Sequence, residues 1–346
     1  MKIEKIVLDH IERCYCSAVL EIDEECHLVL AGEAEGGPCY AYSGPRFSHR
    51  EVVWEHGGGT MSLVQIPGGS NEFLAVQNFF PGFRSETAKI VRGRREKDGR
   101  WTVEDYLALP FIHRFDIFSV GGENWFLGCV LCASKKDRED WSDPGYVAVG
   151  RMPGDGSPME PPTVILSGLT KNHGYCRGTW EGRPAGYVAC EEGVYAVVPP
   201  SAPGGGWTTV LLMDRPVSDM AFCDLDGDGR EEMVTIEPFH GDTIQVYRLD
   251  GGVYRPVYRY PGKVEFAHAL AGCTLAGRPC VVCGVRRADA ELSLLFWDRE
   301  ERNYRVERIE AGVGPSNVAV VRQAGRDLIL SANHTANEGA VYLVTD

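Results

Sequence analysis

A short pattern recurs along this sequence, in which an apolar stretch runs into a glycine-containing turn and a second apolar stretch follows. Successive copies begin 46 to 60 residues apart. They are TMSLVQIPGG from Thr60, HRFDIFSVGG from His113, HGYCRGTWEG from His173, DMAFCDLDGDG from Asp219, HALAGCTLAG from His268, NVAVVRQAG from Asn317 and, more faintly, CYCSAVLEIDEE from Cys14. A recurrence of this length indicates one repeated supersecondary unit, which limits the fold to arrays of similar units.

The repeated unit is built from strands. Few windows show a helical period, and short runs rich in Val, Ile, Tyr, Phe and Leu are broken by Gly, Pro and Asp. After each glycine turn the chain continues with a strand, a polar loop, another strand and usually a fourth. Seven such units predict an all-β fold, a single seven-bladed β-propeller with four-stranded blades. The predicted blades are 11–58, 59–110, 111–168, 169–216, 217–264, 265–314 and 315–346 with 1–10.

The two ends of the chain are expected to meet in one blade. The last unit has only three strands, and the first residues, KIEKIVLD, resemble the outer-strand segment YRVERIEAG of the unit before it. We therefore predict that the N-terminal strand completes the last blade, which hydrogen-bonds the chain ends together and covers a free sheet edge.

The composition narrows the class of protein. The formal charge of −14 is spread along the chain, which argues against nucleic-acid binding, and there is no long apolar run to span a membrane. Charged residues near the N-terminus and twelve cysteines without framework spacing favour a cytoplasmic protein with reduced thiols. The CVLC (129–132) and CVVC (280–283) motifs fall in expected strands. Residues three apart there face opposite sides, so we interpret these cysteines as buried apolar thiols rather than metal ligands.

One repeat carries the segment CDLDGDGREEMV, in which Asp224, Asp226, Asp228 and Glu232 could converge on Ca²⁺. An EF-hand is disfavoured because Thr235 occupies the position of its bidentate glutamate. The alternative is an Asp/Gly turn selected for its backbone conformation, without metal. The other repeats make the same turn with PGG, VGG, WEG or LAG, so most of these turns need no metal.

The DLDGDGREEMV segment inside a β-repeat resembles the FG-GAP or VCBS-type repeat of integrin-like seven-bladed propellers. The family motif places aspartates at loop positions one, three and five and an acid at position nine, and these four acidic residues match it. The resemblance covers residues 219–262 and is only architectural elsewhere. It implies a structural Ca²⁺ in the loop of blade five.

The first strand of each propeller blade lines the central channel, so equivalent positions form a ring. The aligned positions are Cys14, Thr60, His113, His173, Asp219, His268 and Asn317. Three imidazoles and a carboxylate suit Zn, Mn or Fe better than Ca²⁺, so His113, His173, His268 and Asp219 are predicted to hold a divalent transition metal. The alternative is a water-filled channel lined with hydrogen-bonding side chains.

Loops after the second strand of each blade should surround the same end of the channel. We predict that His240 or His334 acts as a general base. The candidate substrate-binding residues are Arg84, Lys135, Arg286, Arg287 and Asn333. A basic and aromatic rim suits a small anionic or polyhydroxylated substrate such as a carbohydrate.

An axial histidine-rich site below basic loops resembles two groups of propeller enzymes, the oligogalacturonate lyases and the aldosulose and anhydrofructose dehydratases. The resemblance implies a metal-dependent lyase or dehydratase acting on a sugar or uronate, with the metal polarising an oxygen while a base removes the neighbouring proton. The alternative is a non-catalytic propeller that binds a protein or glycan and carries a structural Ca²⁺. A lactonase ranks lower, because propeller lactonases hold Ca²⁺ in the channel with carboxylates and Asn rather than histidines.

Overall fold

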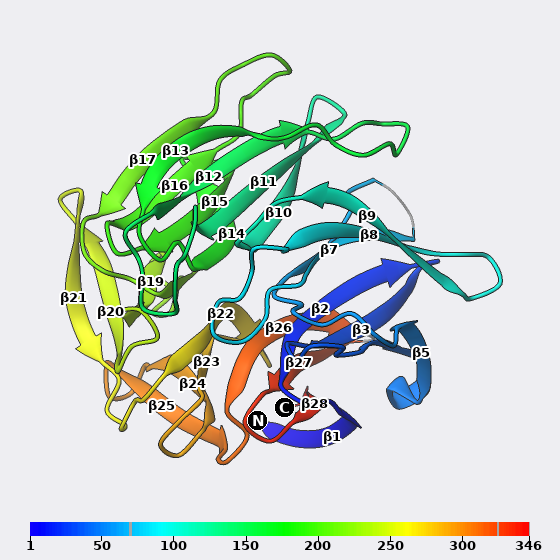
Figure 1. The fold of residues 1–346 in the computed structure, drawn as a ribbon. Helices are drawn as coiled ribbons and strands as arrows, with labels where there is room; N and C mark the ends of the chain where they lie inside the picture. Colours follow the sequence, from blue (N-terminus) through cyan, green and yellow to red (C-terminus); the bar gives the residue numbers. More distant parts are fainter. Residues whose placement is uncertain (69–70, 324, 346) are drawn as a thin grey trace.

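In the parts of the chain that the computed structural model describes, residues 1–68, 71–323 and 325–345, twenty-eight β-strands form seven antiparallel sheets of four strands. The sheets are arranged as blades around a central channel (Figure 1). The prediction of an all-β, seven-bladed propeller is therefore confirmed. Residues 69, 70, 324 and 346, which belong to the units predicted for blades two and seven, lie outside the described residues.

Each blade contributes one strand to each of four concentric layers. The first strands, which line the channel, are β2 (Cys14–Ile22), β6 (Leu63–Gln65), β10 (Ile112–Val120), β14 (Gly174–Trp180), β18 (Asp219–Cys223), β22 (Ala267–Leu275) and β26 (Pro315–Gln323). The second strands are β3 (Glu25–Gly32), β7 (Glu72–Gln77), β11 (Glu123–Cys132), β15 (Arg183–Cys190), β19 (Glu232–Glu237), β23 (Arg278–Val285) and β27 (Arg326–Asn333).

The outer layers follow the same order. The third strands are β4 (Cys39–Ser43), β8 (Lys89–Arg95), β12 (Pro144–Arg151), β16 (Gly193–Val198), β20 (Thr243–Asp250), β24 (Leu292–Asp298) and β28 (Glu338–Thr345). The outermost strands are β5 (His49–Trp54), β9 (Trp101–Ala108), β13 (Thr163–Leu169), β17 (Thr208–Met213), β21 (Val253–Arg259), β25 (Asn303–Glu310) and β1 (Lys2–His10). A short 3₁₀ helix, η1, spans Pro45–Phe47.

The turns between first and second strands explain the glycine pattern of the sequence. Four of them are two-residue turns in which both residues have positive φ, namely 23–24, 121–122, 181–182 and 276–277. This conformation matches the twist of the flanking strands and favours glycine. Three of these four turns contain glycine, so the recurring glycines of the sequence mark these hairpins.

The N-terminal strand closes the ring, as predicted. β1 pairs antiparallel with β28, from Lys2 opposite Thr345 to His10 opposite Glu338, and blade seven has the order β1-β28-β27-β26. Figure 1 shows the two chain ends side by side. The blade thus combines the first and last residues of the sequence and leaves no unpaired edge on β28.

The hydrophobic core lies between neighbouring blades. One cluster joins Phe118 and Leu127 of blade three to Val188 and Val197 of blade four.

The cysteines of both C-x-x-C motifs are buried in β11 and β23, and all twelve cysteines are free thiols. Among the described residues, no helix is long and apolar enough to cross a membrane.

Candidate functional site

Two of the channel histidines, His113 and His268, lie at an irregularity that recurs in the first strand of several blades. In blades one, three, six and seven, the pairing of the first strand with the second skips Tyr15, His113, His268 and Ser316, respectively. Such a bulge takes a residue out of the ladder and re-aims its side chain. The ring positions predicted at Cys14 and Asn317 are therefore displaced by one residue, to Tyr15 and Ser316. In blade five Ser218 rather than Asp219 takes the ring position, because its carbonyl holds His173 as the carbonyl of Ser316 holds His268.

Each ring histidine is held by the main chain of the following blade. The Nδ1 atoms of His113, His173 and His268 lie 3.1, 3.0 and 2.7 Å from the carbonyl oxygens of His173, Ser218 and Ser316, respectively. A carbonyl only accepts hydrogen bonds, so each Nδ1 carries the proton and each neutral ring presents an unprotonated Nε2. This repeated contact fixes the tautomer and the orientation of all three rings.

These imidazoles are neutral at ordinary pH. Burial lowers the pKa of His113 and His268 well below the usual histidine value, and lowers the pKa of His173 to about 3. His240 follows β19 and is partly buried, and its desolvation lowers its pKa in the same direction. Neutral imidazole is the form that binds a metal ion.

Tyr15 lies between two of the ring histidines and was not predicted from the sequence. Its hydroxyl oxygen is 3.3 Å from Nε2 of His113 and 3.2 Å from Nε2 of His268. The phenol has one proton, so it can donate to only one of these two lone pairs. Burial raises the pKa of Tyr15, so the hydroxyl keeps its proton.

Three histidines bring one ring nitrogen each to a common point. These atoms of His173, His240 and His268 lie within 4.8 Å of one another, and Nε2 of His240 is 3.3 Å from Nε2 of His173. Since Nε2 of His173 is unprotonated, this contact needs a proton or a cation between the two nitrogens. Three neutral imidazoles form a ligand set that suits Zn²⁺ and other first-row divalent metals. His113 and Asp219 are not part of this group.

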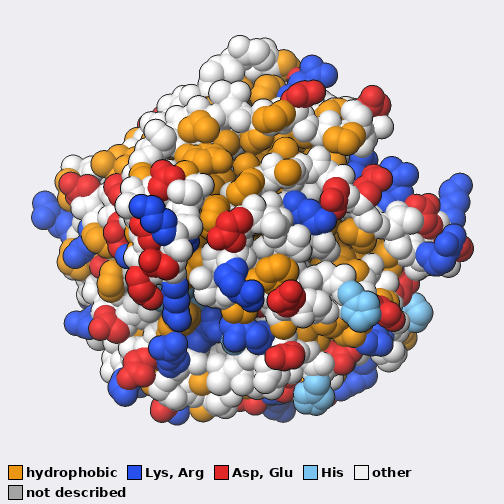
Figure 2. Space-filling view, viewed as in Figure 1, with side chains coloured by type: hydrophobic (Ala, Val, Ile, Leu, Met, Phe, Trp, Pro, Cys, Tyr) orange, Lys and Arg blue, Asp and Glu red, His pale blue; other side chains and the backbone are white. Residues whose placement is uncertain are grey.

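The histidines line a cavity of about 350 Å³ at the channel mouth. Aromatic rings form part of its wall: His240 stacks on Phe239 and Phe266 with centroids 4.0 and 4.3 Å apart, and Phe83 also lines the cavity. Figure 2 shows Lys and Arg side chains gathered below the centre of the face drawn. The residues around the converging histidines His173, His240 and His268 therefore offer a ligand both apolar faces and positive charge.

His334 belongs to a polar network at the edge of this cavity. Its Nε2 lies 3.0 Å from Oε2 of Glu33, and its Nδ1 lies 2.8 Å from Nη2 of Arg286. Arg13 also donates to Glu33, with Nη2 at 2.8 Å. Burial raises the pKa of Glu33, but the His334 hydrogen bond and the charge of Arg13 outweigh it, so that the pKa is lowered overall. Both nitrogens of His334 are therefore engaged, which does not favour its predicted role as a base.

The remaining predicted substrate residues lie in different surroundings. Lys135 is 3.4 Å from the ring centre of Trp141 and donates to the main-chain oxygen of Asp140. Arg84 is exposed. Asn333 is fully buried within blade seven, where its side chain bonds to Ser331, Glu338 and Tyr342. Only Arg286 and Arg287 of the five predicted residues line the cavity that contains the histidines.

Asp219 is buried one residue beyond the ring and accepts a hydrogen bond from the amide of Met220 at 3.0 Å. Burial raises the pKa of Asp219 to about 7, although the charge of Arg114 opposes the shift. The unfolded pKa is about 3.9, so this group's contribution to stability is fully present below pH ~4 and is lost as the pH rises towards 7.

Replacing Asp219 with asparagine should remove this pH-dependent loss, because the amide oxygen still accepts the hydrogen bond and carries no charge. The variant should match wild type near pH ~4 and exceed it by about 2–4 kcal/mol above pH ~7. Urea unfolding at several pH values measures the difference. Asp250→Asn, at an exposed position, is the control and should show no such trend. A constant difference between pH 4 and 8 would contradict the prediction.

The acidic loop of blade five is contacted by the guanidinium group of an arginine on a neighbouring strand. One carboxylate oxygen each of Asp224, Asp226 and Glu232 lies within 4.8 Å of the others. The guanidinium of Arg248, on β20, forms an ion pair with Asp226, and its Nε lies 3.0 Å from Oε1 of Glu232. The Tyr304 hydroxyl donates to the same Glu232 oxygen at 2.8 Å. Arg248 thus supplies positive charge where the sequence predicted Ca²⁺.

The other loop carboxylates are used by the turn itself. Asp224 accepts hydrogen bonds from the amides of Gly227 and Gly229, at 2.9 and 3.0 Å. Asp228, the fourth predicted ligand, accepts from the amide of Arg230 at 2.8 Å and lies outside the three-carboxylate group. These contacts stabilise an Asp/Gly turn.

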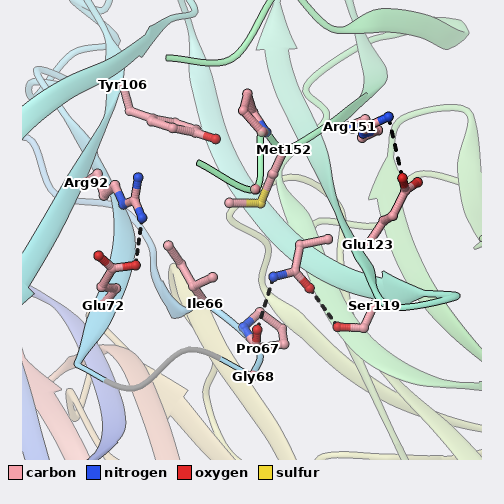
Figure 3. A pocket seen from close by; sticks show the side chains of 14 residues that line it. Ile66, Pro67, Gly68, Glu72, Arg92, Tyr106, Ser119, Glu123, Arg151 and Met152 are labelled. Atoms are coloured by element: carbon pink, nitrogen blue, oxygen red, sulfur yellow. Dashed lines mark hydrogen bonds and ion pairs between the residues drawn. The ribbon is translucent and has the colours of Figure 1, made fainter. Parts of the chain in front are cut away.

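A larger cavity, of about 590 Å³, lies between blades two and three (Figure 3). It shares no lining residue with the histidine cavity. Its arginines are paired within the cavity wall: Arg92 with Glu72 at 2.7 Å and Arg151 with Glu123 at 3.4 Å. This cavity is larger than the histidine cavity, but its arginines already have glutamate partners. We therefore do not identify it as a ligand site.

Tyr15, the ring residue of blade one that was not predicted, could have been found from its distance to the hairpin turn. His113, His173 and His268 each lie eight residues before the first residue of their hairpin turn, at Gly121, Glu181 and Ala276. The same count back from the turn at Asp23 gives Tyr15 rather than Cys14.

Comparison with known proteins identifies the fold. No protein-family model and no curated protein matches this chain, so the FG-GAP or VCBS resemblance stays a prediction. Two solved structures from Bacteroides, both provisionally assigned as 6-phosphogluconolactonases, are similar. The B. uniformis protein has a TM-score of 0.57 and 11% identity over 87% of this chain and 85% of its own. The B. fragilis protein has a TM-score of 0.58 and 12% identity over 89% of this chain and 91% of its own. At this low sequence identity, the similarity shows a shared fold only.

Proposed function

We propose that this propeller is a metal-dependent enzyme that acts on a sugar or sugar acid by elimination at the channel mouth. The observation that carries the proposal is the convergence of ring nitrogens from His173, His240 and His268 within 4.8 Å. Two of these rings have Nδ1 fixed on a main-chain carbonyl, so their lone pairs face the common point. Packing alone does not require three neutral imidazoles to be arranged in this way.

A divalent Zn, Mn or Fe held there would act as a Lewis acid on a carbonyl or carboxylate oxygen of the substrate. Tyr15 touches His268 and carries a proton, which suits it to donate to a leaving hydroxyl or a developing negative charge. His113, whose Nε2 is unprotonated and lies 3.3 Å from the Tyr15 hydroxyl, would take the proton removed from the substrate and return it to Tyr15, so that the proton lost and the proton donated balance. The proposal therefore assigns His240 to the metal group rather than to proton abstraction.

Lactone hydrolysis is the second candidate, because both similar solved structures are provisionally assigned to that activity and are matched over most of their length. A non-catalytic glycan- or protein-binding propeller is the third. The twelve free cysteines support a cytoplasmic location within either enzyme proposal. A structural Ca²⁺ in blade five is the least supported part of the sequence prediction, since Arg248 contacts two of its expected ligands.

Elemental mass spectrometry tests the metal proposal. Wild-type protein, supplied with Zn, Mn or Fe and dialysed, should retain about one equivalent per chain. The triple variant His173→Ala, His240→Ala, His268→Ala should retain none while circular dichroism shows an intact fold. The control triple variant His10→Ala, His49→Ala, His56→Ala removes three exposed histidines and should bind like wild type.

The metal-loaded protein should then be assayed for elimination from uronates and keto-sugars and for hydrolysis of sugar lactones. Elimination that requires the metal supports the first proposal, whereas hydrolysis alone supports the second. Failure of wild type to retain any of the three metals would contradict the metalloenzyme, and the lactone assay would then decide between lactone hydrolysis and the binding module.

A further inference from the structure

Arg286 and Arg287 differ from Arg13 and Arg138, the other arginines of the histidine cavity, in having no acidic partner. Both follow β23 directly. Among the described residues, no carboxylate lies within ion-pair distance of either guanidinium, and the only side chain to which Arg286 donates is neutral His334. Burial lowers the pKa of Arg286. An unpaired, partly desolvated guanidinium is costly unless an anion accompanies it.

The cavity between blades two and three provides an internal comparison. Both of its arginines are neutralised by glutamates within the wall, as Figure 3 shows for Arg92 with Glu72 and Arg151 with Glu123. The chain as a whole carries a formal charge of −14, so acidic partners are abundant. Two adjacent arginines left unmatched at the channel mouth are therefore a local feature of this site.

The two arginines are held in place before any ligand binds. The amides of Arg286 and Arg287 donate to the main-chain oxygens of Phe266 and Glu265, at 3.0 and 3.1 Å. Both guanidinium groups lie over the Phe266 ring, at 4.8 and 4.7 Å from its centre. The main-chain oxygen of Arg286 accepts the Thr335 hydroxyl at 2.9 Å. Fixed guanidinium groups lose little freedom when they bind a planar or tetrahedral anion.

A second cavity, of about 460 Å³, adjoins the one that contains the histidines, because Arg13, Phe266, Arg286 and Arg287 line both. Two carboxylates are close by. Glu33 is already paired with Arg13 and His334, and Glu12 is an exposed residue of the cavity edge. Neither lies within ion-pair distance of Arg286 or Arg287, which leaves their charge available.

We propose that Arg286 and Arg287 form an anion subsite that takes a carboxylate or phosphate group of the substrate beside the histidine cluster. The inference rests on the proposed function, because only that proposal makes the bound anion part of a substrate. It deepens the proposed function by requiring that this substrate be anionic. Guanidinium groups recognise both groups through paired, charge-assisted hydrogen bonds. The rest of the substrate would extend from this subsite towards the common point of the three histidines.

Anion binding can be measured on metal-free protein. The melting temperature of chelator-treated wild type should rise with inorganic phosphate or with acetate at constant ionic strength, since a ligand of the folded state stabilises it. The double variant Arg286→Met, Arg287→Met should bind at least about tenfold more weakly. The control Arg230→Met, Arg326→Met removes the same charge at exposed positions and should respond like wild type.

The outcomes separate the possibilities. Tighter binding of phosphate identifies a phosphoryl subsite, and tighter binding of acetate identifies a carboxylate subsite. If the double variant does not fold, Arg287→Met alone, at an exposed position, should still weaken binding by about threefold or more. No response of wild type to either anion, or equal responses of site and control variants, would overturn the proposal. Because metal is absent throughout, these results do not depend on whether the histidines bind one.

Discussion

Replacing Arg248 with methionine should lower the free energy of unfolding by about 2–4 kcal/mol in calcium-free buffer, and millimolar Ca²⁺ should restore most of the loss. The guanidinium forms ion pairs with Asp226 and Glu232, whose side chains are only 11% and 2% exposed. Removing it leaves two buried carboxylates beside Asp224 with no positive charge between them. The three oxygens then resemble an incomplete calcium site, and Ca²⁺ should supply the missing charge.

Denaturant unfolding with and without Ca²⁺ measures this effect. Wild type should show no comparable response to Ca²⁺, because Arg248 already occupies the position between the carboxylates. Arg255→Met is the matched control: it breaks an exposed ion pair with Asp250 in the same blade and should cost less than about 1 kcal/mol. Equal stabilisation of wild type and Arg248→Met by Ca²⁺ would show that the ion and the guanidinium do not compete.

Removing residues 2–10 should destabilise the protein by about 5 kcal/mol or more, because it leaves the edge of β28 without a partner. The deletion eliminates the whole β1–β28 ladder and uncovers apolar surface that Ile3, Ile6 and Leu8 cover. It also removes Lys5, which bridges Glu310 and Glu338 at 2.8 and 2.5 Å. We expect the truncated chain to unfold at a lower denaturant concentration than wild type and to associate through the exposed strand β28.

Denaturant titration and size-exclusion chromatography measure both consequences. A synthetic peptide with the sequence of residues 1–11 should restore part of the lost stability when added in excess, because it can pair with β28. Val7→Asp alters an exposed side chain on β1 without removing the strand, and should have a small effect. An unchanged unfolding midpoint in the truncated protein would mean that β1 contributes little to ring closure.

The architecture could be predicted from the sequence because it depends on local features. The hairpin turns require residues that tolerate positive φ, and the strands between them are short and apolar, so the repeat is visible without an alignment. Closure by the N-terminal strand followed from the same logic, because the last unit lacked a strand and the first residues resembled an outer strand.

The candidate site was less accessible to sequence reasoning. A bulge in the first strand of blade one moves the ring position from Cys14 to Tyr15, and in blade five Ser218 rather than Asp219 holds the neighbouring histidine. Bulges depend on the pairing of two strands and leave no clear mark in composition. His240 was expected beside the ring as a base, and the structure instead groups one of its ring nitrogens with those of His173 and His268.

The interpretation of the acidic loop shows a different limit. The spacing of its four acids matches a calcium motif and three of them converge, so the Ca²⁺ site stays a prediction, but Arg248 of β20, beyond the end of the motif, contacts two of them. A guanidinium on a neighbouring strand cannot be inferred from the spacing of the acids. Asn333 is a similar case: its polar character suggested the channel mouth, and its amide instead satisfies hydrogen bonds within blade seven.

The contact between each ring histidine and the main chain of the next blade has a consequence for how the site forms. His113 and His173 depend on blades four and five, and His268 depends on the serine that begins the last blade. A chain fragment that ends before Ser316 can contain all three histidines and still lack the main-chain contact that fixes the ring of His268. The site therefore forms only when successive blades have docked and the circle is complete, which makes its geometry a late event of folding and a direct report on assembly.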